Sequence, residues 1–231
     1  MLLLHSFAAM AMAQQQKNDY ATEQSSSMDI PQKKLSFTEA WVWAYTNSDG
    51  SEGEMVVYRE PQTGYWLFTP EAYGSTDEMT EWIVANNEGV YIFTYNDAEL
   101  YTPQKRFVVN VKLKKFDKLP EEWQLLSGSQ YIGDARLGFP RFKGTAYETT
   151  YLKTTERSIF YVAATQADLS AIYYFNHLNI DAKLPISFPE NIPGKQIVLS
   201  EQTKFATGNM GYRFRHISHT TYQINLSDDE Q

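Results

Sequence analysis

One pattern of residues occurs twice in the first half of the chain and limits the possible folds more than any other feature. The copies span residues 54–69 and 81–94, and each has an apolar run, a turn that ends in Gly and a second apolar run. Turn residues of this kind predict a β-hairpin in each copy. Because the apolar residues are consecutive rather than alternating, both faces of these strands should be covered. Two copies are too few for a solenoid or a propeller, so we expect a duplicated hairpin inside an antiparallel meander.

Composition and alternation predict further strands along the chain. The 13 Phe, 16 Tyr and 5 Trp are residue types that pack well on the pleated surface of a sheet. Strands are expected at residues 41–45, 106–116, 147–152 and 158–163, and in a C-terminal hairpin built from residues 196–199 and 212–226. The chain is therefore predicted to be mainly β: an antiparallel meander that forms an open or closed barrel-like sheet with one or two short helices.

Two segments are candidates for those helices. Residues 119–126 have Pro at the first helical position, acidic residues in the first turn and Gly128 as a stop, which predicts a short helix. In residues 165–178, Thr165 with Asp168 fits a capping box, but part of the same segment fits a strand equally well. Helix and strand both stay open there, and three prolines beyond it predict a long connection.

The N-terminus has the character of a targeting segment. Residues 1–13 (MLLLHSFAAMAMA) form an apolar run that ends in small residues, as in a secretory signal peptide, and the run is too short to span a bilayer. Signal peptides normally begin with a basic residue, whereas the first one here is Lys17, so a start upstream of Met1 and a docked N-terminal helix remain alternatives. Residues 14–34 are polar and predict a flexible leader. Residues 35–231 should then be a single β-rich domain, exported in soluble form to the periplasm or the extracellular space.

Charge and composition exclude several classes of function. The net charge of -8 argues against nucleic acid and against an anionic membrane surface as partners. Because the chain has no Cys, it has no disulfide, thiolate metal site or cysteine nucleophile. Residues 47–58 resemble a calcium loop only superficially, since the sixth position is Glu52 instead of Gly and the twelfth is Tyr58 instead of Glu. No nucleophile elbow, zinc-protease helix or phosphate loop is present, so we predict no catalytic residues, no metal and no cofactor.

His216 and His219 are close enough in sequence to raise the question of a shared metal ion. Apolar residues occupy the even positions of this segment, including Tyr212, Phe214 and Ile224. A strand in that phase directs His216 inward and His219 outward. The two imidazoles are therefore not expected to bind one ion together.

The excess of aromatic residues supports three hypotheses about function. In the first, Trp43, Trp66, Trp82 and Tyr91 line the concave face of a curled sheet and hold an apolar, lipid-like or glycan-like ligand. In the second, the protein is a structural or interaction module that engages an envelope protein through its sheet faces or edges. The third, a glycan hydrolase, requires two facing carboxylates at a cleft. The first two differ in whether the aromatic rings line a cavity or fill a core.

Residues 53–74 (GEMVVYREPQTGYWLFTPEAYG) follow an aromatic strand in a chain that begins with a signal-like segment. In this respect the chain resembles uncharacterised exported β-rich envelope proteins of Bacteroidota. The resemblance implies export and brings no functional residues with it.

Overall fold

The computed structural model describes residues 34–73, 80–86, 90–96, 99–109, 116–132, 142–150, 157–178, 182–189, 191–205 and 208–225. The predicted signal peptide at residues 1–13, and the predicted leader up to residue 33, lie outside the described residues. Lys34, the last residue assigned to that leader, is already the first residue of a strand.

The described residues form eleven strands and three short helical segments. The strands are β1 (Lys34–Thr46), β2 (Glu52–Arg59), β3 (Trp66–Phe68), β4 (Thr80–Ala85), β5 (Val90–Asn96), β6 (Glu99–Val109), β7 (Gln124–Ile132), β8 (Phe142–Thr150), β9 (Arg157–Ala164), β10 (Gln196–Phe205) and β11 (Gly208–Asn225). The helical segments are α2 (Pro70–Tyr73), α3 (Ser170–Tyr174) and the 3₁₀ turn η2 (Phe175–His177).

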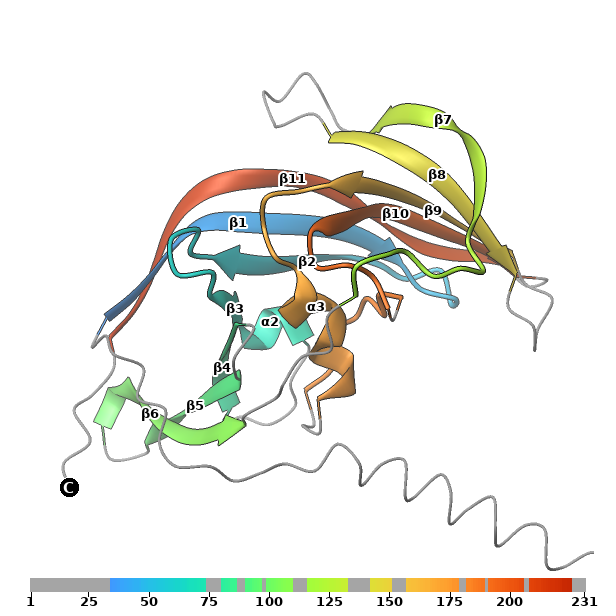
Figure 1. Cartoon of the computed structure of the whole chain (residues 1–231). Coiled ribbons are helices and arrows are strands. Elements are labelled where there is room, and N and C mark those ends of the chain that lie inside the picture. Colours follow the sequence, from blue (N-terminus) through green and yellow to red (C-terminus); the bar gives the residue numbers. More distant parts are fainter. Residues whose placement is uncertain are drawn as a thin grey trace, which may run out of the picture.

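All eleven strands belong to one antiparallel sheet in the order β6-β5-β4-β3-β2-β1-β11-β10-β9-β8-β7. The chain runs outward from β1 to one edge, crosses to the opposite edge at β7 and returns strand by strand to β11, which pairs with β1. The two outer strands, β6 and β7, are not paired with each other within the described residues, so the sheet stays open there. Figure 1 shows the sheet arching over α2 and α3. The predicted mainly β meander with short helices is confirmed.

The duplicated hairpin is also confirmed. β2 pairs with β3, and β4 pairs with β5, at the two copies of the repeated pattern. Both faces of β3 are covered, because Trp66 and Phe68 belong to the larger hydrophobic cluster and Leu67 belongs to the smaller one. Consecutive apolar residues of β3 thus pack into two separate hydrophobic clusters, one on each side of the strand.

The larger cluster lies between the inner face of the sheet and the segment 165–195, which contains α3. Trp41 and Trp43 from β1, Phe214 from β11 and Phe188 from the connection after η2 meet there ring to ring. The smaller cluster joins the ends of β1 and β11 to β3, β4 and β5. Since the chain has no disulfide, burial in these two clusters carries most of the stability.

Two β-bulges in β11 change which of its residues face the core. Phe214 lies opposite Trp43, but the next regular pair is His216 with Val42, and a second irregularity separates His219 from Tyr222. His216 therefore lies with Val42 on the face away from Trp43, which corrects its predicted inward orientation. His216 and His219 still lie on opposite faces of the strand, as expected, because their partners Val42 and Glu39 are three residues apart on β1.

The helix predicted at residues 119–126 is wrong. Only one turn forms, in which the Trp123 N–H donates to the Pro120 carbonyl over 3.1 Å, and the chain enters β7 at Gln124. Pairing with β8 outweighs the local helix signal. In the ambiguous segment 165–178 the helix is the correct alternative, since α3 and η2 occupy residues 170–177.

The remaining strand predictions are confirmed with shifted ends. β8 and β9 cover the segments expected at 147–152 and 158–163, except for residues 151 and 152, which lie outside the described part. β6 begins at Glu99, earlier than the strand expected at 106–116, and residues 110–115 are not described. β10 and β11 form the expected C-terminal hairpin, and β11 begins at Gly208, four residues before the strand predicted at 212–226.

Candidate functional site

The four aromatic residues predicted to bind a ligand do not form one group. Trp43 and Trp66 are buried in the larger cluster, whereas Tyr91 is buried in the smaller cluster and Trp82 packs against it. The Trp43 ring contacts Phe188 and Phe214, and the Trp66 ring meets Trp41 edge-on with centroids 5.3 Å apart. Rings of the chain itself thus occupy the space beside these side chains, and ligand binding by them stays a prediction.

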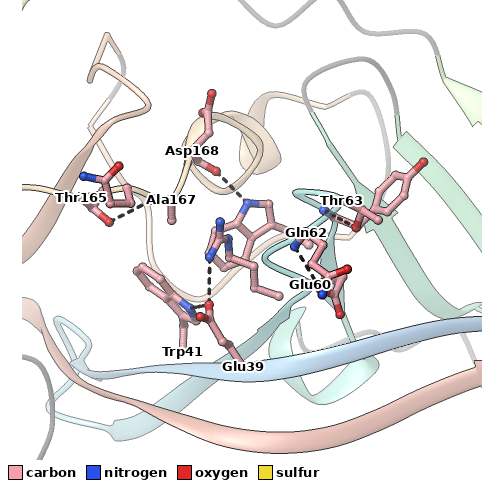
Figure 2. A network of polar contacts seen from close by, with 12 residues as sticks. Glu39, Trp41, Glu60, Gln62, Thr63, Thr165, Ala167 and Asp168 are labelled. Atoms are coloured by element: carbon pink, nitrogen blue, oxygen red, sulfur yellow. Dashed lines mark hydrogen bonds and ion pairs between the residues drawn. The ribbon is translucent and has the colours of Figure 1, made fainter.

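Trp66 is the centre of a polar contact between the sheet and the segment that covers it (Figure 2). Its indole Nε1–H donates to the Asp168 main-chain carbonyl over 2.8 Å, and the Arg59 guanidinium lies 5.6 Å from the ring centroid. The Glu39 carboxylate accepts from Arg59 Nη1 over 3.0 Å and from Trp41 Nε1 over 2.9 Å. The arrangement provides partners for the two indole N–H groups and for Arg59 Nη1, whereas Arg59 Nε is buried without a hydrogen-bond partner among the described residues. Its chemistry is that of a structural clamp.

A carboxyl group lies in the middle of a row of aromatic rings on the inner face. Glu201 on β10 is opposite Phe160 on β9 and Tyr212 on β11, and Tyr212 is in turn opposite Tyr45 on β1. Glu201 is buried, and Thr203 Oγ1 donates to its Oε1 over 3.0 Å. Burial raises the pKa of the Glu201 carboxyl to about 7, although the hydrogen bond from Thr203 and the neighbouring Tyr212 hydroxyl act in the opposite direction.

A polar hydroxyl pair continues this row toward the end of the sheet. Ser158 Oγ and Thr203 Oγ1 are 2.6 Å apart, both residues are buried, and they lie opposite each other on β9 and β10. Because Thr203 donates to Glu201, its oxygen is available to accept from Ser158. The hydrogen-bonded series Ser158, Thr203 and Glu201 therefore holds a carboxyl group that can bind a proton inside the protein. No cationic side chain takes part in these contacts.

The described surface has a hollow of about 330 Å³ between the start of β1 and the turn that follows β2. Residues 34–38 form one wall, and residues 60–63 with Tyr65 form the other. β2 pairs with β1 only from Glu39 onward, where Glu39 lies opposite Arg59. Within the described residues, the first part of β1 therefore has a strand neighbour on the β11 side only.

The two outer strands of the sheet differ in how they are protected. β6 contains Glu99, Pro103, Lys105 and Arg106, the types of residue that prevent an edge from pairing with other strands. β7 has the sequence QLLSGSQYI, with no charge and no proline. Leu125 is 66% exposed and Leu126 is 46% exposed, and no other large hydrophobic side chain is exposed among those the structure describes.

Sequence reasoning missed this edge because it assigned residues 119–126 to a helix. The segment 124–132 overlaps that range and has no charge and no proline, and its last two residues, Tyr131 and Ile132, are of types enriched in strands. The hollow was missed for a different reason. It depends on the register in which β2 pairs with β1, from Glu39 onward. The turn at residues 61–64 indicates where β2 ends, but not which residues of β1 are left beyond the pairing.

Nowhere in the described ranges do three or more His, Asp or Glu side chains gather in a way that would hold a metal ion. None of the helices in those ranges has the length and apolar character needed to cross a membrane.

Comparison with known proteins yields little. No family model matches the chain, and no curated protein matches it. Among solved structures, that of PNGF-II in the C2 space group is similar with a TM-score of 0.38 and 14% sequence identity. The match covers 84% of this chain but 29% of PNGF-II. A likeness at this level bears on neither the site nor the activity.

Proposed function

We propose that the protein is an interaction module that binds an extended segment of another protein along the outer edge of β7, which has no strand neighbour among the described residues. The observation that carries this proposal is the pair of exposed leucines, Leu125 and Leu126, on an outer strand that has neither charge nor proline. Strand addition to an open sheet edge supplies main-chain hydrogen bonds for affinity and side-chain contacts for specificity.

The geometry of β7 divides the edge into two parts with different roles. Two bulges interrupt its pairing with β8 near Ser127, whereas residues 129–132 pair regularly with residues 142–145. The regular part offers a ladder of main-chain groups on its outer side. The irregular part presents Leu125 and Leu126 as apolar anchors, a use that their exposure supports.

Charges beside the leucines indicate the chemistry of the partner. Glu121 and Glu122 are exposed just before Trp123 and β7, whereas Glu148 on β8, opposite Gln124, already has Arg157 Nη1 at 3.8 Å. A partner segment with alternating apolar residues and basic residues at one end would complement this arrangement. The packing of Trp43 and Trp66 against the chain's own rings also favours an interaction module over a carrier with a concave aromatic cavity.

Amide hydrogen exchange with a synthetic probe tests the proposal. The probe is a nonapeptide of alternating Thr and Val with two Lys at one end, and the matched control peptide has Pro at its centre and cannot continue a ladder. We expect the probe to slow exchange of amides in residues 129–132 by about tenfold or more, while the Pro peptide has no effect.

Matched variants locate the binding. Leu125→Lys with Leu126→Lys should abolish protection, because two cations then face a basic partner, whereas Gln202→Lys at an exposed position on β10 should leave it unchanged. Protection that appears on β6, or that survives the leucine substitutions, would contradict the proposal.

The place of action is part of the same proposal. The apolar residues 1–13 support export of the chain, and the partner would then be a protein of the envelope or of the exterior. N-terminal sequencing of the protein purified from cell fractions tests this point. A mature N-terminus at Gln14 in the exported fraction is expected, and an uncleaved cytoplasmic protein would contradict it.

A further inference from the structure

The hollow beside the start of β1 has features of a binding site that is separate from β7. Its volume of about 330 Å³ lies at the lower end of the range for small-molecule pockets. In an antiparallel strand, alternate residues direct both the N–H and the C=O to the same side. Because residues 34–38 lack a strand neighbour on the side of the hollow within the described part, main-chain donors and acceptors there are available to a ligand.

The opposite wall is a turn that is fixed by its own hydrogen bonds. The Glu60 N–H donates to the Tyr65 carbonyl over 2.9 Å, and the Gly64 N–H donates to the Glu60 carbonyl over 2.9 Å. The Gln62 N–H donates to the Glu60 carboxylate over 3.0 Å (Figure 2). These contacts leave the side chains of Gln62 and Thr63 exposed at the hollow on a preformed backbone. A preformed site reduces the entropy cost of binding.

One aromatic ring completes the lining. Tyr65 lines the hollow and is half-buried, and its ring meets Tyr91 edge-on with centroids 6.2 Å apart. Tyr91, which the sequence analysis predicted to bind a ligand, therefore packs against Tyr65, a residue that lines the hollow. A ring held in this way offers an apolar face beside several hydrogen-bonding groups.

The lining as a whole favours a small, neutral ligand rich in hydroxyl groups. Lys34 and Glu60 contribute one charge of each sign, and Ser36, Thr38 and Thr63 contribute hydroxyls that both donate and accept. A peptide strand is less suitable, because β2 occupies the edge of β1 from Glu39 onward and blocks its continuation. We infer that the hollow between residues 34–38 and 60–65 binds a neutral saccharide of one or two units.

Saturation-transfer NMR on the full chain tests this inference. The probes are cellobiose, maltose and N,N′-diacetylchitobiose, each at millimolar concentration, with glucuronic acid as a charged comparison. At least one neutral disaccharide should receive saturation, and Gln62→Ala should weaken its binding by about fivefold or more, the effect of one lost hydrogen bond. Gln62 is exposed and its main-chain N–H bond survives the substitution, so the turn should still fold.

Matched controls separate this site from the β7 edge and from unspecific binding. Gln202→Ala removes the same exposed amide from β10 and should leave saccharide affinity unchanged, as should the Leu125→Lys, Leu126→Lys double variant. Three outcomes would overturn the inference: no saturation of any neutral disaccharide, equal binding by the Gln62→Ala variant, or preferential binding of glucuronic acid. The β7 proposal is unaffected by any of them.

Discussion

The indole N–H of Trp66 donates a hydrogen bond to the main-chain carbonyl of Asp168, which lies 102 residues further along the chain, over 2.8 Å. This bond joins β3, in the N-terminal half of the sheet, to the segment that leads into α3. The Trp43 Nε1–H, by contrast, is buried without a hydrogen-bond partner among the described residues. Two buried tryptophans of the same cluster thus differ in whether the indole N–H is hydrogen-bonded.

This difference predicts unequal effects of the same substitution. Trp66→Phe and Trp43→Phe both remove ring volume, but only Trp66→Phe leaves the Asp168 carbonyl without its indole donor. Trp66→Phe should therefore lower the free energy of unfolding by about 1–3 kcal/mol more than Trp43→Phe. Urea denaturation of the two variants measures the difference, and equal losses would show that the bond to Asp168 contributes nothing net.

Substitution of Gly by Ala should lower the stability of the protein by different amounts at two strand positions. A Cβ at Gly211 would meet the main-chain oxygen of Glu201 on β10, which cannot move without disturbing the sheet. A Cβ at Gly53 would meet the end of the Tyr45 side chain, which is able to rotate away. We expect Gly211→Ala to cost about 1–3 kcal/mol and Gly53→Ala distinctly less. Thermal unfolding of both variants checks this order, and a larger loss for Gly53→Ala would refute it.

Asn176 holds the connection between η2 and β10 in place. Its Nδ2 donates to the carbonyls of Leu184 and Ile186, over 3.3 and 3.0 Å, and its Oδ1 accepts from the Leu184 N–H over 2.7 Å. Asn176→Ala should destabilise the protein by about 2 kcal/mol, because three main-chain groups lose partners. Amide exchange in residues 182–189 should accelerate as well.

Asn47 provides the control for Asn176. Its Nδ2 donates to Ser51 Oγ over 2.9 Å in an exposed turn, where water replaces the lost contact. Asn47→Ala should change stability by no more than about 0.5 kcal/mol. If the two alanine variants unfold at the same urea concentration, the proposed role of Asn176 is wrong.

The buried Glu201 carboxyl should make stability depend on pH. Its pKa is raised from 4.5 to about 7 in the folded protein, mainly by burial, so the folded state holds a proton that the unfolded state has released between these values. The free energy of unfolding should thus fall as pH rises from about 4.5 to about 7, by at most about 3 kcal/mol from this group.

Glu201→Gln isolates that contribution. The neutral amide has a similar shape and does not titrate, so the difference in stability between the variant and the natural chain should shift in favour of the variant as pH rises through this range. Parallel urea titrations at several pH values measure it. A difference that stays constant from pH 4.5 to 7 would mean that the Glu201 carboxyl does not titrate with a raised pKa.

Local patterns predicted a large part of the fold. The repeated hairpin, the strand at Trp41 and Trp43 and the C-terminal hairpin depend on turn residues and on apolar periodicity, which act over a few residues. The same reasoning failed at residues 119–126, where Pro120 and two acidic residues imitate a helix start but the chain pairs with β8 instead. It failed again at His216, where a bulge reverses the phase of alternation.

The candidate sites were less accessible to prediction than the strands. Trp43, Trp66, Trp82 and Tyr91 were chosen for their chemistry, and the structure distributes them between two clusters. The uncharged sequence of β7 was visible, but its position at the edge of the sheet was not. Whether a strand lies at the edge of a sheet depends on how all the other strands of that sheet pair with one another.

The sequence by itself determined that this chain forms antiparallel hairpins with aromatic faces, because turn chemistry and side-chain period are local properties. The tertiary structure alone decided that β1 pairs with β11, that β7 is left at an edge, that a hollow opens beside residues 34–38 and that Glu201 is buried. These features depend on pairings between segments far apart in the chain. The free energy of such pairings comes from the faces that the whole chain can bury together, and not from any single segment.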